Sequence, residues 1–354
     1  MPAINPDPGF WRGRRVLLTG HTGFKGCWLA FWLHHLGAAV TGIARSPAEH
    51  RLFRLLHLDD LVQTRVADLR DASAVAAAVA ATQPDVVLHL TAQTSVQRSV
   101  VDPAESFAIN VLGTVHLLDA LRAVPHLAGV LVVTTDKVYA DIPDGQARQE
   151  GDRLGGRDPY SASKAAVELA TAAMAQSFLA PNGVAVATAR AGNVIGGGDF
   201  APGRLVPDVV NAARSGQKLT LRNPASRRPW QHVLDCLSGY LLYAAALATD
   251  PTVPPALNFG PRNAAGPTVG EIANAMLEAL GAPDAWAYAP TPEVRETHVL
   301  SLDSTLARRT LGWSDRLPGQ RMIAETAAWY QAWAEAADMR AVTLQQITAY
   351  EALS

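Results

Sequence analysis

Two residues that can move a proton, Tyr160 and Lys164, stand four positions apart in the segment Tyr-Ser-Ala-Ser-Lys. On a helix, this spacing brings both side chains to one face. The ammonium group stabilises a phenolate and lowers the pKa of the tyrosine, so the phenol can take a proton from an alcohol near neutral pH. An ordinary exposed helix pair has the same spacing, so the surrounding motifs must decide between the two interpretations.

A second polar cluster, Thr134-Thr135-Asp136-Lys137, directly follows the apolar run from Val130 to Val133. Ionisable residues at the end of a buried strand are costly to desolvate unless they are paired or used in chemistry. One interpretation is a turn in which Asp136 bonds the local backbone, and the other is a hydroxyl, an acid and a base beside the tyrosine. The second interpretation gives a predicted catalytic set of Thr135, Asp136, Lys137, Tyr160 and Lys164.

Three glycines, Gly20, Gly23 and Gly26, lie between an apolar run at Val16 to Thr19 and a helical pattern that continues to Leu36. Glycine permits a tight turn and lets a pyrophosphate approach backbone N–H groups, while the positive end of the next helix dipole offsets its charge. The spacing is GxxGxxG rather than GxGxxG, and alone it could be a plain strand-to-helix turn. Together with the polar cluster after a later strand, it predicts a dinucleotide site.

Other polar residues follow the apolar runs of this region, at the expected carboxyl ends of parallel strands. Asp68 ends a third apolar run and Leu90 ends a fourth, and open α/β sheets bind their ligands at such strand ends. The residues expected to hold the dinucleotide are Gly20, Thr22, Gly23, Phe24, Gly26, Arg45, Asp68, Leu69, Leu90, Ala92, Gln93, Asn110, Thr134, Tyr160, Lys164 and Ala191.

The position that usually selects between the two nicotinamide dinucleotides is ambiguous. An Asp or Glu is expected about 20 residues after the glycines, where it bonds the ribose 2′-hydroxyl of NAD. The chain instead has Ala44-Arg45-Ser46. Arg45 could contact the 2′-phosphate of NADP or be a solvated loop arginine, so NAD is expected and NADP is left open.

Arginines also occur in the second half of the chain, at Arg204 and in the segment Arg227-Arg228-Pro-Trp-Gln-His. The planar guanidinium fork matches phosphate oxygens, and tryptophan or proline can line a base or a sugar. Each residue taken singly is better explained by a structural or solvated role. Together with Asn193 and the segment Gly196 to Asp199, they suggest a diphosphate site that faces the dinucleotide-binding lobe. The predicted substrate-binding residues are Gln93, Ser95, Asn193, Arg204, Leu205, Arg228 and Arg295.

These motifs need a scaffold of alternating strands and helices. From Arg15 to about Ala191, short apolar runs alternate with longer alanine-rich segments such as Ala104 to Arg122. Strands this apolar are covered on both faces, which predicts an α/β fold with a doubly wound parallel sheet of the Rossmann type and a smaller, mixed α/β C-terminal substrate domain. The expected division is a dinucleotide-binding domain at 1–192, with 233–262 returning to it, and a substrate-binding domain at 193–232 and 263–354.

The composition argues against several classes of protein. The 354 residues carry 30 basic and 32 acidic side chains, so no broad charged surface is available for nucleic acid or anionic lipid. Cys27 and Cys236 form no CxxC or Cys/His spacing, so neither a disulfide framework nor a metal site is expected. The N-terminus lacks the apolar core of a secretory signal, and no apolar run approaches the roughly 20 residues of a membrane span, which predicts a cytoplasmic protein.

Taken together, these motifs resemble those of the extended short-chain dehydrogenase/reductase family, and within it most closely the CDP-glucose 4,6-dehydratases. The resemblance runs through nearly the whole chain, at Thr19 to Gly26, Asn110 to Thr114, Thr135 to Lys137, Asp158 to Ser161, Ala189 to Asp199, Arg228 to Val233 and Leu311 to Trp313. The glycine turn and the tyrosine–lysine pair mark only the superfamily, whereas Thr-Asp-Lys, Gly-Gly-Gly-Asp and Arg-Pro-Trp-Gln-His are much narrower.

The resemblance implies an NAD-dependent lyase that converts CDP-glucose, or a related nucleotide hexose, into the 4-keto-6-deoxy sugar and water. Tyr160, aided by Lys164 and Thr135, would remove the 4-hydroxyl proton while hydride passes from C4 to NAD⁺. Lys137 would then abstract the C5 proton, Asp136 would protonate the departing 6-hydroxyl, and the hydride would return to C6. The resemblance also implies a role in deoxysugar and polysaccharide biosynthesis and a homodimer or larger homo-oligomer.

Two stretches that flank the expected sugar site depart from the family pattern. Ala140 to Gln149 replaces a tryptophan-containing stretch, and Thr94 to Arg98 stands where Pro-Leu-Val-Arg-Arg is usual, so the hexose, the nucleotide or the reaction could differ. One rival is a nucleotide-sugar epimerase, which needs no acid/base pair such as Asp136 and Lys137. The other is a non-catalytic dinucleotide-binding sensor, which has no use for an intact Tyr160.

Overall fold

A parallel sheet of seven strands forms the centre of the computed structural model, which describes residues 4–46, 49–140, 146–262, 266–283, 285–289 and 300–353. The strand order is β10-β6-β5-β4-β1-β2-β3, and all neighbours are parallel. The strands are β1 (Arg15–Thr19), β2 (Ala39–Ala44), β3 (Gln63–Val66), β4 (Val86–His89), β5 (Gly129–Val133), β6 (Ala185–Ala191) and β10 (Ala256–Phe259). The order reverses between β1 and β4, which is where doubly wound sheets bind ligands. The predicted Rossmann-type sheet is confirmed.

The apolar runs of the sequence occupy the middle of this sheet. Every residue of β4 and β5 is buried, because helices cover both faces. β3 differs: its sequence is Gln-Thr-Arg-Val, and the Val66 side chain is 70% exposed. The prediction that Asp68 ends an apolar run is therefore wrong, because β3 is the edge strand of the sheet and needs little apolar character.

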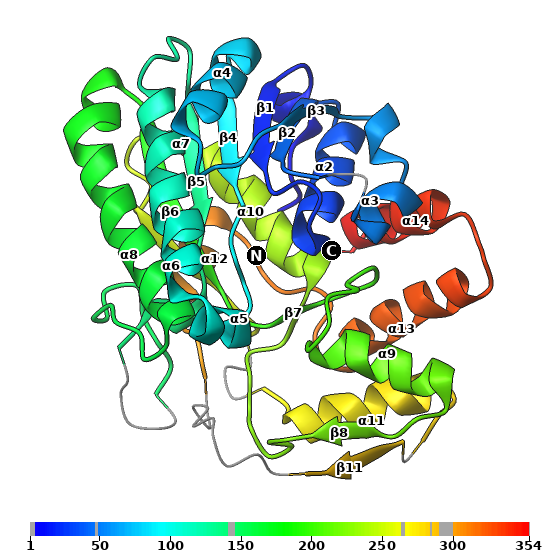
Figure 1. Ribbon diagram of the computed structural model, residues 1–354. Helices are drawn as coiled ribbons and strands as arrows, with labels where there is room; N and C mark the ends of the chain where they lie inside the picture. The colour runs from blue at the N-terminus through cyan, green and yellow to red at the C-terminus, as the bar shows by residue number, and fades with distance from the viewer. Residues whose placement is uncertain are drawn as a thin grey trace.

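Two separate cores hold helices against the two faces of the sheet (Figure 1). One face is covered by α4 (Ala72–Thr82), α7 (Gly113–Leu121) and α8 (Pro159–Met174), and the other by α2 (Phe24–His35) and α10 (Val233–Leu247). The helix expected at Ala104 to Arg122 is divided into α6 (Pro103–Phe107), a π-helical turn (Ala108–Leu112) and α7, which follow one another without a break.

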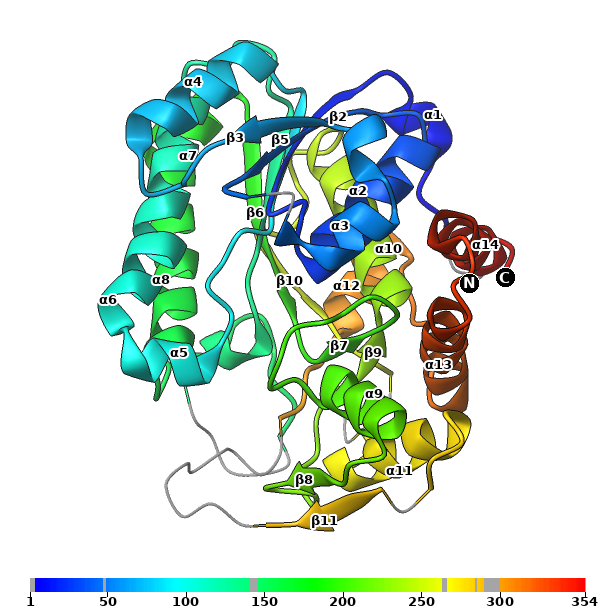
Figure 2. The ribbon, with the colours of Figure 1, turned by 45° about the vertical axis from the view of Figure 1, so that its right-hand side comes forward.

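A smaller lobe lies below the sheet in the views of Figures 1 and 2. Its elements are α9 (Leu205–Ser215), β8 (Leu219–Leu221), α11 (Val269–Ala279), β11 (Trp286–Tyr288) and α13 (Gln320–Ala334). β8 and β11 pair in parallel. The chain first enters this lobe through β7 (Val194–Ile195) and leaves it through β9 (Gln231–His232), which pair with each other in a short parallel ladder. It returns to the lobe for α11, β11 and α13.

Two C-terminal helices lie against the first lobe. α12 (Thr305–Leu311) packs against α10 and β10, and α14 (Met339–Glu351) packs against α2. Trp32 Nε1 donates a hydrogen bond to Glu351 Oε1 at 2.7 Å, and Asn5 Nδ2 donates one to the backbone oxygen of Glu351 at 2.8 Å. The two ends of the chain therefore lie close together (Figure 1).

The remaining elements are short. They are the helices α1 (Pro8–Trp11), α3 (Arg51–Leu55) and α5 (Val96–Val101), the 3₁₀ turns Leu58–Asp60, Asp136–Val138 and Ala180–Asn182, and a π-helical turn, Ala175–Leu179. Cys27 and Cys236 are both free and buried. Within the described ranges, no helix combines the length and the apolar character that a membrane span requires.

Candidate active site

The glycine turn between β1 and α2 leaves no space for side chains at two of its three glycines. Gly20 has a φ of +75°, and a Cβ there would lie 2.9 Å from the backbone nitrogen of Thr91. A Cβ on Gly26 would lie 2.0 Å from the carbonyl oxygen of Gly20. A Cβ on Gly23 would meet only that same oxygen, at 3.4 Å, and no side chain caps the start of α2. The turn is thus a cradle of backbone N–H groups at a helix N-terminus, which fits the pyrophosphate of a dinucleotide.

Gly26→Ala is expected to weaken dinucleotide binding at least about tenfold, because the added methyl group would push α2 away from Gly20. Calorimetric titration with NAD measures the change. Gly151→Ala is the matched control, since a Cβ there meets nothing within 4 Å and the backbone is not left-handed. Equal affinities for NAD in the two variants would contradict the role given to this turn.

The side-chain amide of Asn110 joins the loop after β4 to helix α8. Asn110 Oδ1 accepts a hydrogen bond from the backbone nitrogen of Gln93 at 2.8 Å, and Asn110 Nδ2 donates one to Ser163 Oγ at 2.9 Å. The Gln93 side chain donates to Ser106 Oγ at 2.9 Å and accepts from the backbone nitrogen of Ser95 at 2.5 Å. The side chain of Gln93 therefore supports the loop itself, and its backbone lies just beyond the strand end.

Tyr160 and Lys164 lie in the first two turns of α8, which begins directly after its capping residue Asp158. The two residues are 9% and 4% exposed. Lys164 Nζ donates to the carbonyl oxygen of Val133, at the end of β5, at 2.7 Å. Burial raises the pKa of Tyr160 to about 12 and lowers the pKa of Lys164 to about 7, so each group alone is driven toward its neutral form.

The polar cluster after β5 reaches this tyrosine. A hydrogen bond between the side chains of Thr135 and Tyr160 lowers the pKa of the tyrosine, and the Thr135 hydroxyl also donates to Asp136 Oδ1 at 3.0 Å. Asp136 is 4% exposed, and burial raises its pKa against smaller opposing effects of Lys137, Thr135 and Arg228. The structure thus brings Thr135, Asp136 and Tyr160 into one buried cluster, and Lys137 stands half-buried beside it.

A buried ion pair that the sequence interpretation missed braces α8. Glu168 lies one turn after Lys164, and its carboxylate accepts hydrogen bonds from Thr134 Oγ1, from Thr188 Oγ1 at 2.7 Å and from Arg190 Nη2 at 2.7 Å. The side chains of Glu168 and Arg190 are 3% and 6% exposed. Arg190 Nη1 also donates to the Tyr139 hydroxyl at 3.0 Å. This network joins α8 to the ends of β5 and β6.

Arg45 follows β2 and faces a carboxylate of the chain itself. Its guanidinium lies 3.8 Å from Asp68 Oδ2, and Arg70 Nη2 lies 2.6 Å from the same oxygen. The hydrogen bond from Arg70 holds the pKa of Asp68 below its usual value. Asp68 is therefore an anion flanked by two arginines just beyond β3.

Arg204 precedes α9 and bridges the two lobes. Its guanidinium donates to Asp199 Oδ2 at 3.0 Å and to Thr94 Oγ1 at 2.9 Å. The charge of Arg204 also lowers the pKa of Tyr160, which places the arginine near the catalytic cluster. Leu205 follows as the first residue of α9.

Arg228 approaches the cluster from the segment before β9. It is 7% exposed, and its charge opposes the raised pKa of Asp136. Asn193 accepts a hydrogen bond from the backbone nitrogen of Gln231 at 3.0 Å through its own backbone oxygen, beside the β7–β9 ladder. Arg295, which the sequence also assigns to the substrate, lies outside the described residues.

Lys25, in the glycine turn, is a second residue that the sequence interpretation missed. Its Nζ donates to the Tyr240 hydroxyl at 3.3 Å, and burial lowers its pKa, with Asp136 among the groups that oppose the shift. The signal in the sequence is a single charged residue at the start of an otherwise apolar helix, Phe24–His35. Its charge therefore acts on the same cluster as the predicted catalytic residues.

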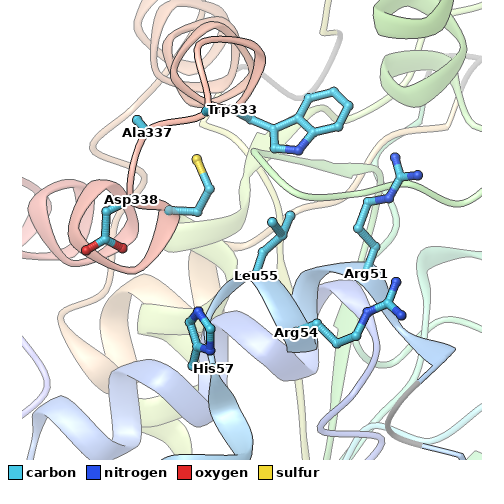
Figure 3. Close-up of a pocket in the computed structure, with 9 residues that line it drawn as sticks. Arg51, Arg54, Leu55, His57, Trp333, Ala337 and Asp338 are labelled. Carbon is cyan, nitrogen blue, oxygen red and sulfur yellow. The ribbon is translucent and has the colours of Figure 1, made fainter.

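A surface cavity of about 720 Å³ lies between α3 and the turn from α13 to α14 (Figure 3). Arg51, Arg54 and His57 line one side of it, and Trp333 and Asp338 line the other. The lining includes no residue predicted for the dinucleotide, the substrate or the catalytic steps. The candidate active site is therefore defined by the strand ends rather than by this cavity.

Comparison with known proteins gives a match over most of the chain. The model of the family described as "NAD dependent epimerase/dehydratase family" matches residues 16–260. CDP-glucose 4,6-dehydratase of Salmonella typhimurium is 39% identical over 351 residues, covering 97% of this chain and 98% of that protein. dTDP-glucose 4,6-dehydratase of Streptomyces antibioticus is 32% identical over 337 residues, covering 90% and 94%.

A solved structure adds a comparison of folds. It is the crystal structure of a double mutant of dTDP-glucose 4,6-dehydratase from Streptomyces venezuelae with NAD bound, which is 25% identical to this chain. The TM-score is 0.78, and the match covers 92% of this chain and 99% of that one. With the family match and the relatives above, it leads to one conclusion: this chain belongs to the NAD dependent epimerase/dehydratase family.

Proposed function

We propose that this chain is an NAD-dependent sugar-nucleotide 4,6-dehydratase that converts CDP-glucose into the 4-keto-6-deoxy sugar and water. The observation that carries the proposal is the position of Asp136. This buried carboxyl has a raised pKa and contacts Thr135, whose hydroxyl also contacts Tyr160. A reaction that only oxidises and reduces an alcohol needs no such acid, whereas the elimination of water does.

The proposed cofactor is NAD, with its pyrophosphate at the turn of Gly20, Gly23 and Gly26 and the rest along the ends of β2 to β5. Bound there, NAD would supply the acceptor for the hydride from C4 and the donor that returns it to C6 while C5 regains a proton, so no second redox substrate would be consumed. Arg45 faces Asp68 at 3.8 Å, so its charge is already partly balanced, which favours NAD over NADP.

Tyr160 is the proposed base for the proton of the sugar 4-hydroxyl. A hydrogen bond with the Thr135 side chain lowers the pKa of Tyr160 and so favours its phenolate form. Lys164, fixed by the Val133 carbonyl at 2.7 Å, supplies a positive charge one turn along α8. Removal of this proton lets the C4–H bond break and leaves a ketone at C4.

Lys137 and Asp136 are the proposed base and acid for the loss of water. The ketone acidifies the proton on C5, and Lys137, half-buried next to Asp136 in the chain, takes it. Asp136 gives its proton to the 6-hydroxyl, so the C6–O bond breaks, a C5–C6 double bond forms and water leaves. Burial raises the pKa of Asp136, which favours the protonated form that this step needs.

CDP-glucose is the proposed substrate because the relative from Salmonella typhimurium, which the chain matches over nearly its full length, is named CDP-glucose 4,6-dehydratase. Arg204 and Arg228 are proposed to bind the diphosphate, since both guanidinium groups act on the catalytic cluster from the smaller lobe.

The test is incubation of the purified protein with CDP-glucose, dTDP-glucose and UDP-glucose, followed by mass spectrometry in ordinary and heavy water. The expected result is loss of one water from CDP-glucose, with deuterium at C5 when the solvent is heavy water. Inversion at a sugar carbon without loss of mass would support an epimerase instead. No change in any of the three sugars, in protein that binds NAD, would contradict the proposal.

Asp136→Asn is expected to lower the rate of water loss by about 10²–10⁴-fold, the range of general acid catalysis, and to leave the first oxidation in place. Reduced nicotinamide should then accumulate on the enzyme and be visible by its absorbance. Asp250→Asn is the control, because Asp250 makes only local hydrogen bonds to Thr252. Water loss at the wild-type rate in Asp136→Asn would remove Asp136 from the mechanism.

We also propose a division of the chain into two domains. Residues 1–192 and 233–262 form the dinucleotide-binding domain, and residues 193–232 and 263–354 form the nucleotide-sugar-binding domain.

We also propose a homodimer or larger homo-oligomer formed through the outer surface of α5 to α8. That surface carries exposed apolar side chains: Val100, Val101, Phe107, Leu112, Leu169 and Phe178. We propose a cytoplasmic location. We also propose a role in making deoxysugars for polysaccharide biosynthesis, a process that consumes nucleotide sugars.

A further inference from the structure

The two oxygens of the Asp136 carboxyl have different surroundings. Oδ1 accepts a hydrogen bond from the Thr135 hydroxyl at 3.0 Å. Oδ2 is buried from solvent and has no hydrogen-bond partner among the described residues. An unpartnered buried carboxylate oxygen is costly, whereas a protonated carboxyl loses far less on burial.

Gly192 lies next to the unpartnered oxygen, and the ring of Pro229 lies next to Gly192, so that the two residues form one wall on this side of the carboxyl. A Cβ built on Gly192 would lie 3.2 Å from Asp136 Oδ2, 2.5 Å from Pro229 Cγ and 3.1 Å from the backbone oxygen of Pro229. Glycine contributes no side chain at this point, so the carboxyl and the proline ring can both approach. Proline has no backbone N–H, so it offers the oxygen no hydrogen-bond donor.

The proline is held in place by its neighbours in the smaller lobe. Trp230 Nε1 donates to the backbone oxygen of Pro267 at 3.1 Å, and Arg227 Nη1 donates to that of Gly266 at 2.8 Å. Gly266 has a φ of +53°, and a Cβ there would lie 2.1 Å from the backbone oxygen of Arg228. The segment around Pro229 is therefore fixed on both sides, and the wall it forms is rigid.

We infer that Gly192 and Pro229 are positioning residues that hold one oxygen of Asp136 in a dry pocket without donors and thereby keep this carboxyl in the acid form that water elimination needs. The inference rests on the proposed function and deepens it. It also explains why a glycine follows β6 and why a proline stands in the Arg-Pro-Trp-Gln-His segment. Neither residue touches the reacting atoms in this account; both act through Asp136.

Other charged and titratable groups face the Asp136 carboxyl, and the cations among them favour its ionised form, which the pocket must disfavour. They are Lys25 from α2, Lys137 beside it in the chain, Tyr160 from α8, Tyr240 from α10 and Arg228 from the segment before β9. The cations among them favour the carboxylate, so exclusion of water and donors is the influence that favours the protonated form.

The test compares Gly192→Ala and Pro229→Ala with wild type. In Gly192→Ala the new methyl group must displace the proline ring or the carboxyl, and in Pro229→Ala the smaller residue admits water and adds an N–H donor without a clash. Infrared difference spectra against Asp136→Asn isolate the carbonyl band of protonated Asp136, and its disappearance with rising pH gives the midpoint. The pH dependence of water loss from CDP-glucose is measured on the same proteins.

In wild type, the midpoint should lie well above the usual aspartate value of about 3.9. In both variants the midpoint should fall by about one pH unit or more. Above the midpoint, the rate of water loss should fall about tenfold for each further pH unit, because the rate follows the fraction of Asp136 in the acid form. Gly151→Ala should behave as wild type, because a Cβ there meets nothing within 4 Å.

Folded variants that keep the wild-type midpoint and pH profile would overturn the inference. If Gly192→Ala does not fold, Pro229→Ala still tests the inference, because its smaller side chain creates no steric clash. If wild type removes water from none of the three nucleotide sugars, the proposed function fails, while the infrared midpoint still shows whether the pocket holds Asp136 protonated.

Discussion

Tyr160→Phe is expected to lower kcat for water loss from CDP-glucose by about 10²–10⁴-fold, the range that a positioned acid or base contributes. The phenylalanine ring fills the same site, which is 9% exposed, but lacks the hydroxyl that contacts Thr135. Because Tyr160 acts before every later step, keto sugar should form only at this reduced rate and reduced nicotinamide should not accumulate. This absence distinguishes the variant from Asp136→Asn, in which reduced nicotinamide accumulates.

Two controls accompany this prediction. Binding of NAD by Tyr160→Phe should match wild type in a calorimetric titration, because the ring remains in place. Tyr288→Phe should keep the wild-type kcat, since Tyr288 is 61% exposed and lies in the smaller lobe. A kcat for Tyr160→Phe within a few-fold of wild type would show that another group removes the 4-hydroxyl proton.

Glu168→Ala is expected to lower the free energy of unfolding by about 3–5 kcal/mol, the cost of leaving one partner of a buried ion pair alone. The guanidinium of Arg190 would keep its buried site but lose the carboxylate at 2.7 Å. Thr134 and Thr188 would also lose their acceptor. Urea unfolding followed by circular dichroism measures the change.

Glu105→Ala is the matched control for the ion pair. Its partner Arg98 is 60% exposed, so loss of this surface pair should cost no more than about 1 kcal/mol. A loss of similar size for both glutamates would mean that the buried network contributes no special stability.

Glu168→Gln should also change the pH dependence of the reaction. The Glu168 carboxylate raises the pKa of Lys164, which burial lowers to about 7. Removing the Glu168 charge lowers the pKa of Lys164 further. As the pH rises, Lys164 in the variant therefore loses the positive charge beside Tyr160 at a lower pH than in wild type. The alkaline fall in kcat should therefore begin earlier than in wild type, and an unchanged alkaline limb would show that Glu168 acts on the fold alone.

Much of the scaffold could be predicted from the sequence because central parallel strands are apolar on both faces. The runs at Val16, Val86 and Val130 begin strands of this kind, and the polar residues after them lie at one edge of the sheet. The four-residue spacing of Tyr160 and Lys164 predicted one face of a helix, because a helix repeats every three to four residues, and both residues lie on α8.

The parts that could not be predicted depend on pairs that are distant in the sequence. Glu168 reads as an ordinary charged residue of an alanine-rich helix, and only the fold brings it to Arg190. An arginine inside the buried strand Ala185–Ala191 was the available signal, because such a charge requires a partner. The edge strand β3 was misjudged because the apolar pattern of a central strand does not apply at an edge.

The contact between α2 and α14 joins two segments that are far apart in the sequence. Trp32 is 0% exposed; its ring centroid lies 5.6 Å from that of Tyr350, and its Nε1 donates a hydrogen bond to Glu351 Oε1 at 2.7 Å. The indole is therefore covered on that side only while α14 is docked against α2. Detachment of α14 would uncover a large apolar ring on the first lobe, and such exposed apolar surface favours aggregation.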